Sequence, residues 1–128
     1  MPEAVDIDVV LSGLVPLELR NSQTTQEEEN AAFATLAEFN NGAVFTGSFS
    51  GESAWERHLA GDELVHILKG ETRLTILFED SEDVLILKAG MLTVVPKGRW
   101  HRFHAPKGVT VLTATPQPTD HSTAEDPR

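Results

Sequence analysis

Short runs of alternating apolar and polar residues, separated by turn residues, dominate the chain from Ala43 to Thr115. Because successive side chains of a β-strand point to opposite faces, this period of two predicts strands with one buried face. Short strands punctuated by glycine and proline at regular spacing are typical of an all-β sandwich or barrel. Residues 84–87 are apolar throughout, which predicts a strand buried on both faces. The predicted strands are 43–50, 53–59, 63–68, 71–78, 83–88, 91–95, 100–104 and 109–115.

The pattern is weaker in the first third of the chain. Residues 5–11 alternate and predict a strand that starts the sheet. Thr25 and Glu28 have the spacing of a capping box, which predicts a short helix. The tight turn at Asn40-Asn41-Gly42 favours a strand over residues 33–39, paired with the run that follows. A helix is the alternative there, because alanine and leucine are good helix formers.

Length and composition indicate one domain. A chain of 128 residues matches the usual domain size, and we expect residues 1–128 to form a single unit with its core over 43–115. Residues 116–128 are polar, which predicts a mobile or loosely packed tail. No long apolar run predicts a membrane span, and no secretory signal is visible. The lack of cysteine excludes disulfides and thiolate metal sites and fits a cytoplasmic protein.

The charge balance bears on the partners. Twenty acidic residues against ten basic ones give a net charge of −10, which argues against nucleic acid as a partner. Basic residues gather only around His101, where they hint at an anionic substrate, although surface solubility is the favoured interpretation. These basic residues are Lys97, Arg99, Arg102 and Lys107.

Four residues have the types and the spacing of a metal site. Glu56 and His58 are two apart, so their side chains share one face of a strand. Gly61-Asp62 predicts a turn, after which Glu63 can fold back beside them, and His101 comes from a later strand. Two imidazoles with one or two carboxylates, and a position left open, suit a catalytic divalent ion.

The two segments that carry these residues resemble the two motifs of the cupin superfamily. The first motif is Gly, five residues, His-x-His, three or four residues, Glu, six residues, Gly; the second is Gly, five residues, Pro-x-Gly, two residues, His, three residues, Asn. The chain matches them over about residues 50–105. The positions in register are His58, Glu63 and Gly70 in the first motif and Gly90, Pro96, Gly98 and His101 in the second.

The chain also departs from the pattern. Glu56 replaces the first histidine, Ser50 stands at the opening glycine, and Ala105 replaces the closing asparagine. The resemblance implies a double-stranded β-helix, or jelly-roll, barrel in which His58, Glu63 and His101 bind one metal ion. Glu56 is then a fourth ligand, or a catalytic base that stays off the metal. A carboxylate hardens the site and favours Mn²⁺, Fe²⁺ or Zn²⁺.

Other conspicuous side chains have less specific interpretations. Alternation places His66, His104, Trp55 and Trp100 on the outer face, away from the proposed ligands. His121 lies in the polar tail, where we expect it to be solvated. An apolar pocket beneath the metal is expected from Val65, Ile67 and Phe103.

Three functions fit these observations. The first is a metal-dependent enzyme acting on a small organic molecule, of the oxygenase, isomerase or lyase type. The second is a non-catalytic barrel that binds a metal or small ligand, and the third is a structural barrel without metal. We also expect a homodimer, because the strand predicted over residues 5–11 would offer an edge for exchange or pairing.

Overall fold

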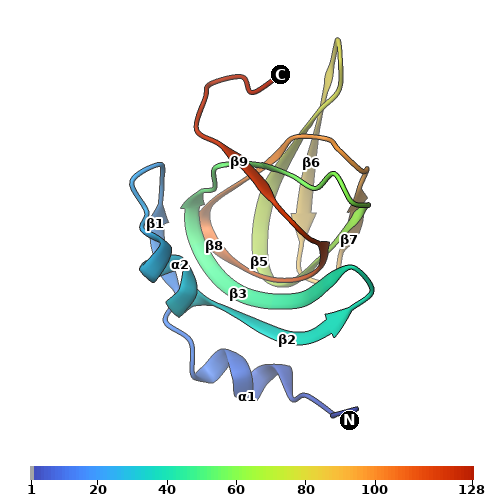
Figure 1. Ribbon diagram of the computed structural model, residues 1–128. Coiled ribbons are helices and arrows are strands. Elements are labelled where there is room, and N and C mark those ends of the chain that lie inside the picture. Colours follow the sequence, from blue (N-terminus) through green and yellow to red (C-terminus); the bar gives the residue numbers. More distant parts are fainter. Residues whose placement is uncertain (1) are drawn as a thin grey trace.

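Strands form most of the chain, as the alternating pattern predicts. The structure is a computed structural model that describes residues 2–128. Nine strands hydrogen-bond into one sheet that curls around itself (Figure 1). The predicted all-β jelly-roll barrel is thereby confirmed. The strands are β1 (Leu17–Arg20), β2 (Phe33–Phe39), β3 (Gly42–Glu52), β4 (Trp55–Arg57), β5 (Glu63–Leu77), β6 (Glu82–Lys88), β7 (Leu92–Val95), β8 (His101–Pro116) and β9 (Asp120–Ser122).

Two long strands form the centre of the sheet. β8 pairs with β3, β4 and β5, and β5 pairs on its other side with β6 and β7. The sequence pattern predicts each of these long strands as two shorter ones, and this is wrong. Gly70 and Gly108 have positive φ and lie within β5 and β8, where they bend the strands without ending them. A glycine followed by renewed alternation therefore marks a bend here.

The predicted capping box is present at the start of α2 (Gln26–Ala32). The Thr25 hydroxyl accepts a hydrogen bond from the Glu28 amide, and the Glu28 carboxylate accepts one from the Thr25 amide. The helix leads directly into β2, which pairs with β3 through the predicted turn at Asn40-Asn41. The strand interpretation of residues 33–39 is thus confirmed over the helical alternative.

The prediction of a strand over residues 5–11 is wrong, because residues 7–11 belong to helix α1 (Ile7–Ser12) and Asp6 caps it. The Asp6 carboxylate accepts a hydrogen bond from the Val9 amide and caps the helix, which outweighs the alternation. The partly buried residues are Ile7, Val10, Leu11 and Leu14, which is the i, i+3, i+4, i+7 period of a helix lying on the barrel. The edge strand proposed for pairing with a second copy is therefore absent from residues 2–128.

The prediction that residues 84–87 are buried on both faces is also wrong. Val84 and Ile86 of β6 are 48% and 46% exposed, whereas Leu87 is buried. β6 pairs only with β5 and lies at the margin of the sheet, so no layer covers its outer face. An apolar run at a sheet margin does not by itself indicate burial.

The C-terminal residues pack more tightly than the sequence suggests. β9 pairs antiparallel with β4, and in Figure 1 it crosses the open end of the barrel. The prediction of a loosely packed tail is wrong for this segment, because short polar strands can be held by backbone pairing without an apolar face. β9 thereby brings Thr119 and His121 to the barrel opening.

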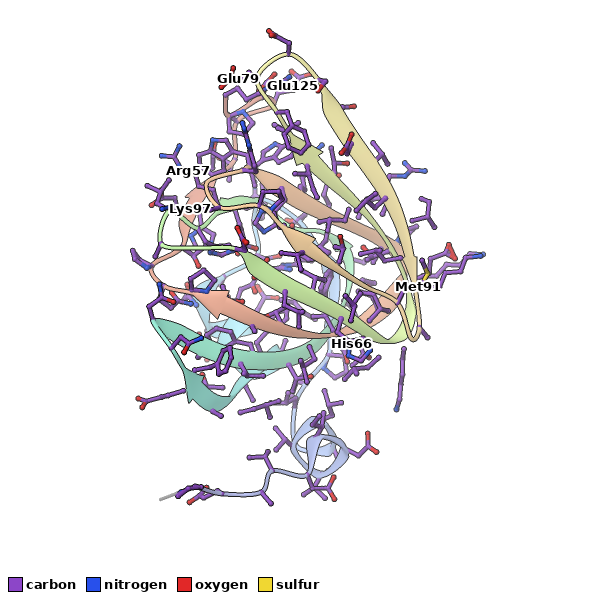
Figure 2. The ribbon with its side chains drawn as sticks, turned by 90° about the vertical axis from the view of Figure 1, so that its right-hand side faces the viewer. Arg57, His66, Glu79, Met91, Lys97 and Glu125 are labelled. Carbon is purple, nitrogen blue, oxygen red and sulfur yellow. The ribbon has the colours of Figure 1, made fainter. Side chains whose placement is uncertain are left out.

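The core fills the barrel between these strands. Val65, Ile67 and Leu74 of β5 are fully buried and pack with Phe49 and Phe103 from β3 and β8. In the side view, Arg57 and Lys97 lie at the opposite side of the barrel from Met91 (Figure 2). No helix among residues 2–128 is long and apolar enough to cross a membrane.

Candidate metal centre

Three of the predicted site residues meet inside the barrel. His58 follows β4, Glu63 begins β5 and His101 begins β8. Their side chains come from three places in the sequence, and each residue is almost fully buried, with 3%, 5% and 1% of its surface exposed. One ligand atom from each lies within 4.8 Å of the others. We call these three residues the triad.

The carboxylate of Glu63 lies between the two imidazoles. Glu63 Oε1 is 3.0 Å from His101 Nε2, and Glu63 Oε2 is 3.3 Å from His58 Nε2. The two rings are 5.2 Å apart, centroid to centroid, and tilted by 46°. Both Nε2 atoms therefore point toward one centre that the carboxylate shares.

Neighbouring groups hold the triad in this orientation. The Nδ1 atom of His101 donates a hydrogen bond to the Arg99 carbonyl at 3.0 Å, and because a carbonyl can only accept, Nδ1 carries the proton. The Thr119 hydroxyl is 3.0 Å from His58 Nδ1. The Thr115 hydroxyl donates to Glu63 Oε2 at 2.6 Å. Such outer partners leave Nε2 of each imidazole for the centre and are typical supports of metal ligands.

The electrostatics of the triad favour an ionised carboxylate. Burial tends to raise the pKa of Glu63, but the imidazoles of His101 and His58, which lie close to its two oxygens, outweigh this effect and hold the pKa at about 2. Burial tends to lower the pKa of His101, yet the Glu63 carboxylate raises it overall. The buried negative charge thus depends on a positive charge beside it, which a bound cation would also supply.

The donor atoms also fit a divalent ion. Nε2 of His58 and Oε1 of Glu63 are buried and have no hydrogen-bond partner within residues 2–128. Buried polar atoms without partners are costly, so native structures rarely keep them without a reason. Two imidazole nitrogens and one carboxylate form the donor set of catalytic zinc and non-haem iron sites. His58, Glu63 and His101 could therefore bind one metal ion.

Glu56 lies beside the triad, but its carboxylate is not among the ligand atoms that converge there. In the sheet it stands directly opposite His101 on β8 and opposite His121 on β9, so the three side chains form a row on one face. Its carboxylate oxygens are 4.0 Å from Arg20 Nη2 and 3.9 Å from His121 Nε2. The carboxylate is thus directed toward the pocket opening, while it remains close enough to His101 to raise the pKa of that imidazole.

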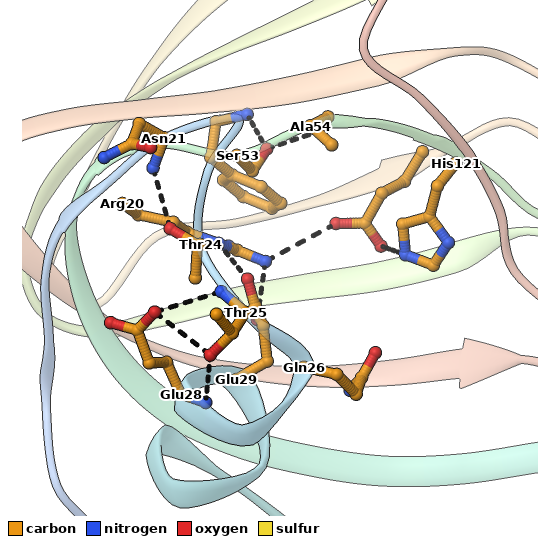
Figure 3. Close-up of polar contacts among 12 residues, drawn as sticks. Arg20, Asn21, Thr24, Thr25, Gln26, Glu28, Glu29, Ser53, Ala54 and His121 are labelled. Atoms are coloured by element: carbon orange, nitrogen blue, oxygen red, sulfur yellow. Dashed lines mark hydrogen bonds and ion pairs between the residues drawn. The ribbon is translucent and has the colours of Figure 1, made fainter.

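A pocket of about 480 Å³ opens to the surface and reaches the triad at Glu63. Glu63 and Glu56 are part of its lining, and most of its apolar wall is aromatic. Arg20 of β1 lines the same pocket, and its guanidinium forms a double hydrogen bond with Glu29 of α2 (Figure 3). The aromatic lining residues are Phe33, Phe45, Phe49 and Phe103.

The other side chains predicted near the site lie partly in the pocket wall and partly away from it. Phe103 lines the pocket as expected, whereas Val65 and Ile67 lie in the buried core. Neither tryptophan lines the pocket, and each packs under an arginine: Trp55 under Arg102 and Trp100 under Arg57. His66 and His104 lie outside the group of three, and His104 is 3.6 Å from Glu52 on the outer surface.

Several pocket residues stand at positions that no sequence pattern marks. The basic cluster around His101 does not line the pocket, and the arginine that does is Arg20, 81 positions before that histidine in the chain. His121 is 64% exposed through its side chain, as expected, but it stands at the pocket opening beside Glu56. No local motif marks Arg20, Thr119 or His121. They reach the pocket only because β1 pairs with β3 and β9 pairs with β4.

Solved structures resemble this fold over most of the barrel. A hydroquinone 1,2-dioxygenase in complex with Cd²⁺ and 4-hydroxybenzonitrile is 21% identical, with a TM-score of 0.57 over 66% of this chain and 63% of that chain. A cupin-2 domain containing protein from Shewanella frigidimarina is 26% identical, with a TM-score of 0.52 over 71% of this chain and 80% of that one. Oxalate decarboxylase from Bacillus subtilis, a protein with Mn(II) centres, is 18% identical, with a TM-score of 0.51 over 66% of this chain and 22% of that one.

These likenesses establish the fold and leave the activity open. The chain spans less than two thirds of the dioxygenase chain and under a quarter of the decarboxylase chain. Among proteins with curated descriptions, none matches. The sequence model of the cupin domain, however, matches residues 47–114, which is more than half of the chain and contains all three triad residues. The chain belongs to the cupin domain family.

Proposed function

We propose that this protein is a metal-dependent enzyme that acts on a small organic molecule, by oxygenase, isomerase or lyase chemistry. The observation that carries the proposal is the triad: two buried imidazoles and a buried carboxylate, with unpaired donor atoms, beside an open pocket. A purely structural barrel has no need for unpaired polar atoms in its interior. A pocket that reaches the triad also gives a small molecule access to it.

The donor set favours Mn²⁺, Fe²⁺ or Zn²⁺, because all three accept mixed nitrogen and oxygen ligands. A bound ion of this kind supplies Lewis-acid chemistry for substrate oxygens and, if it is iron, redox chemistry. The solved structures with Cd²⁺ and Mn(II) support a metal in a barrel of this fold. The dioxygenase among them, which is named for its action on hydroquinone, supports a small organic substrate.

Glu56 is the residue we propose for proton transfer, while Glu63 holds the metal. A general base must reach the pocket and keep its carboxylate off the metal. Glu56 lines the pocket, and its oxygens are not among the converging ligand atoms of the triad. The alternative is that Glu56 is the fourth ligand, as its position in the cupin motif suggests. The two roles differ in whether metal content depends on this carboxylate.

Elemental analysis of protein purified without chelators tests the metal. We expect about one equivalent of Mn, Fe or Zn, and protein that binds none of them from buffers containing each would contradict the proposal. Metal-dependent turnover is then sought with panels of small acids, phenols and thiols, using oxygen consumption for oxygenase activity and product analysis for the other classes. Metal binding without turnover on any panel would favour a non-catalytic binding protein.

The change Glu56→Gln separates the two roles of this side chain. A base role predicts full metal content with loss of turnover, whereas a ligand role predicts lost metal as well. Glu52→Gln is the matched control, because Glu52 is a half-exposed carboxylate on β3 that does not line the pocket. The control is expected to keep both metal and turnover.

We further propose that the chain forms a homodimer. Five apolar residues on β6, β7 and the turn between them are 45–58% exposed and do not line the pocket, and burying them against a second copy would remove them from water. They are Val84, Ile86, Met91, Leu92 and Val94.

Light scattering at micromolar concentration is expected to give the mass of two chains, and the variant Ile86→Asp is expected to give the mass of one. Val9→Asp on α1 is the control for an exposed valine elsewhere, and a monomer mass for the unchanged protein would contradict the proposal.

A further inference from the structure

The outer part of the pocket contains an arginine that is held in a fixed orientation. The side chain of Arg20 is only 12% exposed. Its Nε and Nη2 atoms donate to the two carboxylate oxygens of Glu29 at 2.8 and 2.9 Å. Its guanidinium also lies over the rings of Phe33 and Phe49, 5.2 and 4.8 Å from their centroids. Two hydrogen bonds and two ring faces together fix the plane of the guanidinium.

Part of this guanidinium remains for a ligand. Arginine has five N–H donors, and the two hydrogen bonds to Glu29 use two of them. Within residues 2–128, Nη1 has no hydrogen-bond partner, and Arg20 lines the pocket. The Glu56 carboxylate is 4.0 Å from Nη2, which is within ion-pair distance but beyond hydrogen-bond distance. The pocket therefore presents donors that suit the oxygens of a carboxylate.

An aromatic wall connects this arginine to the triad. Phe33 and Phe49 are 6.0 Å apart, Phe49 and Phe103 are 5.9 Å apart in an edge-to-face arrangement, and Phe103 is 6.3 Å from the ring of His101. Four of the six phenylalanines in the chain line this one pocket. Such spacings suit further aromatic contacts, so the wall favours a planar ring over an extended aliphatic chain.

The charges of the pocket permit an anionic ligand. Arg20 is the one lysine or arginine in the described lining, and three carboxylates accompany it: Glu29, Glu56 and Glu63. A divalent ion at the triad together with Arg20 would balance these three negative charges. The loaded pocket would then carry no net negative charge to repel an acid, and Arg20 would supply the local attraction.

We infer that the pocket binds a small aromatic carboxylic acid. Its carboxylate lies on the free edge of Arg20, its ring lies along the phenylalanine wall, and its other end faces the triad. A volume of about 480 Å³ accommodates one such ring with its substituents. This inference rests on the proposed function, because it takes the triad end of the pocket as the reacting end.

Calorimetric titration of the metal-loaded protein tests the inference with three probes: benzoate, benzamide and cyclohexanecarboxylate. We expect benzoate to bind at least tenfold more tightly than the other two, because benzamide lacks the charge and the cyclohexane ring lacks the flat face. The change Arg20→Lys is expected to weaken benzoate binding at least tenfold and to leave benzamide binding unchanged. Lysine keeps the charge beside Glu29 but cannot offer a second pair of donors.

Arg57→Lys is the matched control, since Arg57 is an arginine paired with Asp120 and stacked on Trp100 outside the pocket lining. Equal affinities for benzoate and benzamide would overturn the inference, as would an equal loss of both ligands in Arg20→Lys. If that variant does not fold, the comparison of the three probes on the unchanged protein decides alone. Metal content is measured on every sample: a protein that binds metal but shows no preference for benzoate refutes this inference and leaves the proposed function standing.

Discussion

At the scale of single residues, the site depends on side chains that differ greatly in how visible they are in the sequence. His58, Glu63 and His101 stand at motif spacing, and the structure brings their donor atoms within 4.8 Å of one another. Thr115 and Thr119, which hydrogen-bond to Glu63 and His58, belong to no motif. Threonine is common on strand surfaces, so nothing in its type indicates which threonine will face a carboxylate.

The change Thr115→Val tests how far this support matters. Valine keeps the shape but removes the 2.6 Å hydrogen bond to Glu63 Oε2, so the carboxylate loses its orientation. We expect metal affinity to fall by about 10- to 100-fold, as for other lost partners of metal ligands. Competition with a chelator of known affinity measures the change.

Thr72→Val is the matched control for this change. Thr72 is equally buried, and its hydroxyl donates to the His104 carbonyl, away from the triad. The control is expected to lose stability but no metal affinity. If both variants bind metal like the unchanged protein, Thr115 does not support the site.

At the scale of whole elements, the existence of a strand was predictable where alternation is strong, whereas the positions at which strands end were not. Gly70 and Gly108 indicated breaks, yet the strands continue through them, because glycine at positive φ lets a strand bend while its pairing resumes. Residues 5–11 fit both the strand period and the helical period, and the cap at Asp6 decided between them. β9 has almost no apolar pattern, so only its pairing with β4 reveals it.

The bend at Gly70 gives a prediction about stability. At this position φ is +77°, and an added Cβ would overlap the carbonyl oxygen of Gly108. Gly70→Ala therefore combines a left-handed backbone with a backbone clash, and we expect unfolding to require about 3 kcal/mol less free energy. Gly90→Ala is the control: its φ is +89°, but nothing lies within 4 Å of the added Cβ. That variant should lose only about 1–2 kcal/mol of unfolding free energy. Urea denaturation measures both variants, and equal losses would show that the clash with β8 does not affect stability.

The role of β9 can be tested by shortening the chain. Removal of residues 117–128 deletes β9 and with it the hydrogen bond between Thr119 and His58. We expect the barrel to keep its far-ultraviolet dichroism, since its core strands end at Pro116, while metal affinity falls about tenfold or more. Removal of residues 124–128 alone leaves β9 in place and is expected to keep full affinity. Equal affinity in both shortened chains would mean that β9 does not hold the site.

At the scale of the whole molecule, the barrel and the triad depend on each other. The family and its fold were predictable because the motif spacing records where strands begin and turn. The pocket was less predictable, because its wall combines residues of every element from β1 to β5 with residues of β8 and β9, and no short sequence window contains them together. Arg20 lies closest along the chain to α2, yet it acts at an opening formed largely by strands far from it in sequence.

This mutual dependence predicts that metal stabilises the entire fold. The three triad residues lie on β5, on β8 and just after β4, and they converge only when these parts of the barrel are paired, so an ion binds the folded chain in preference to the unfolded one. At a free metal concentration one hundred times the dissociation constant, the free energy of unfolding rises by about 2.7 kcal/mol. For a domain of this size, that corresponds to an increase of about 10 °C in the melting temperature. Scanning calorimetry of chelated and metal-loaded protein measures it, and His101→Ala is expected to abolish the increase. If chelation leaves the melting temperature of the unchanged protein where it was, or if His101→Ala shows the full increase, the triad does not bind the stabilising ion.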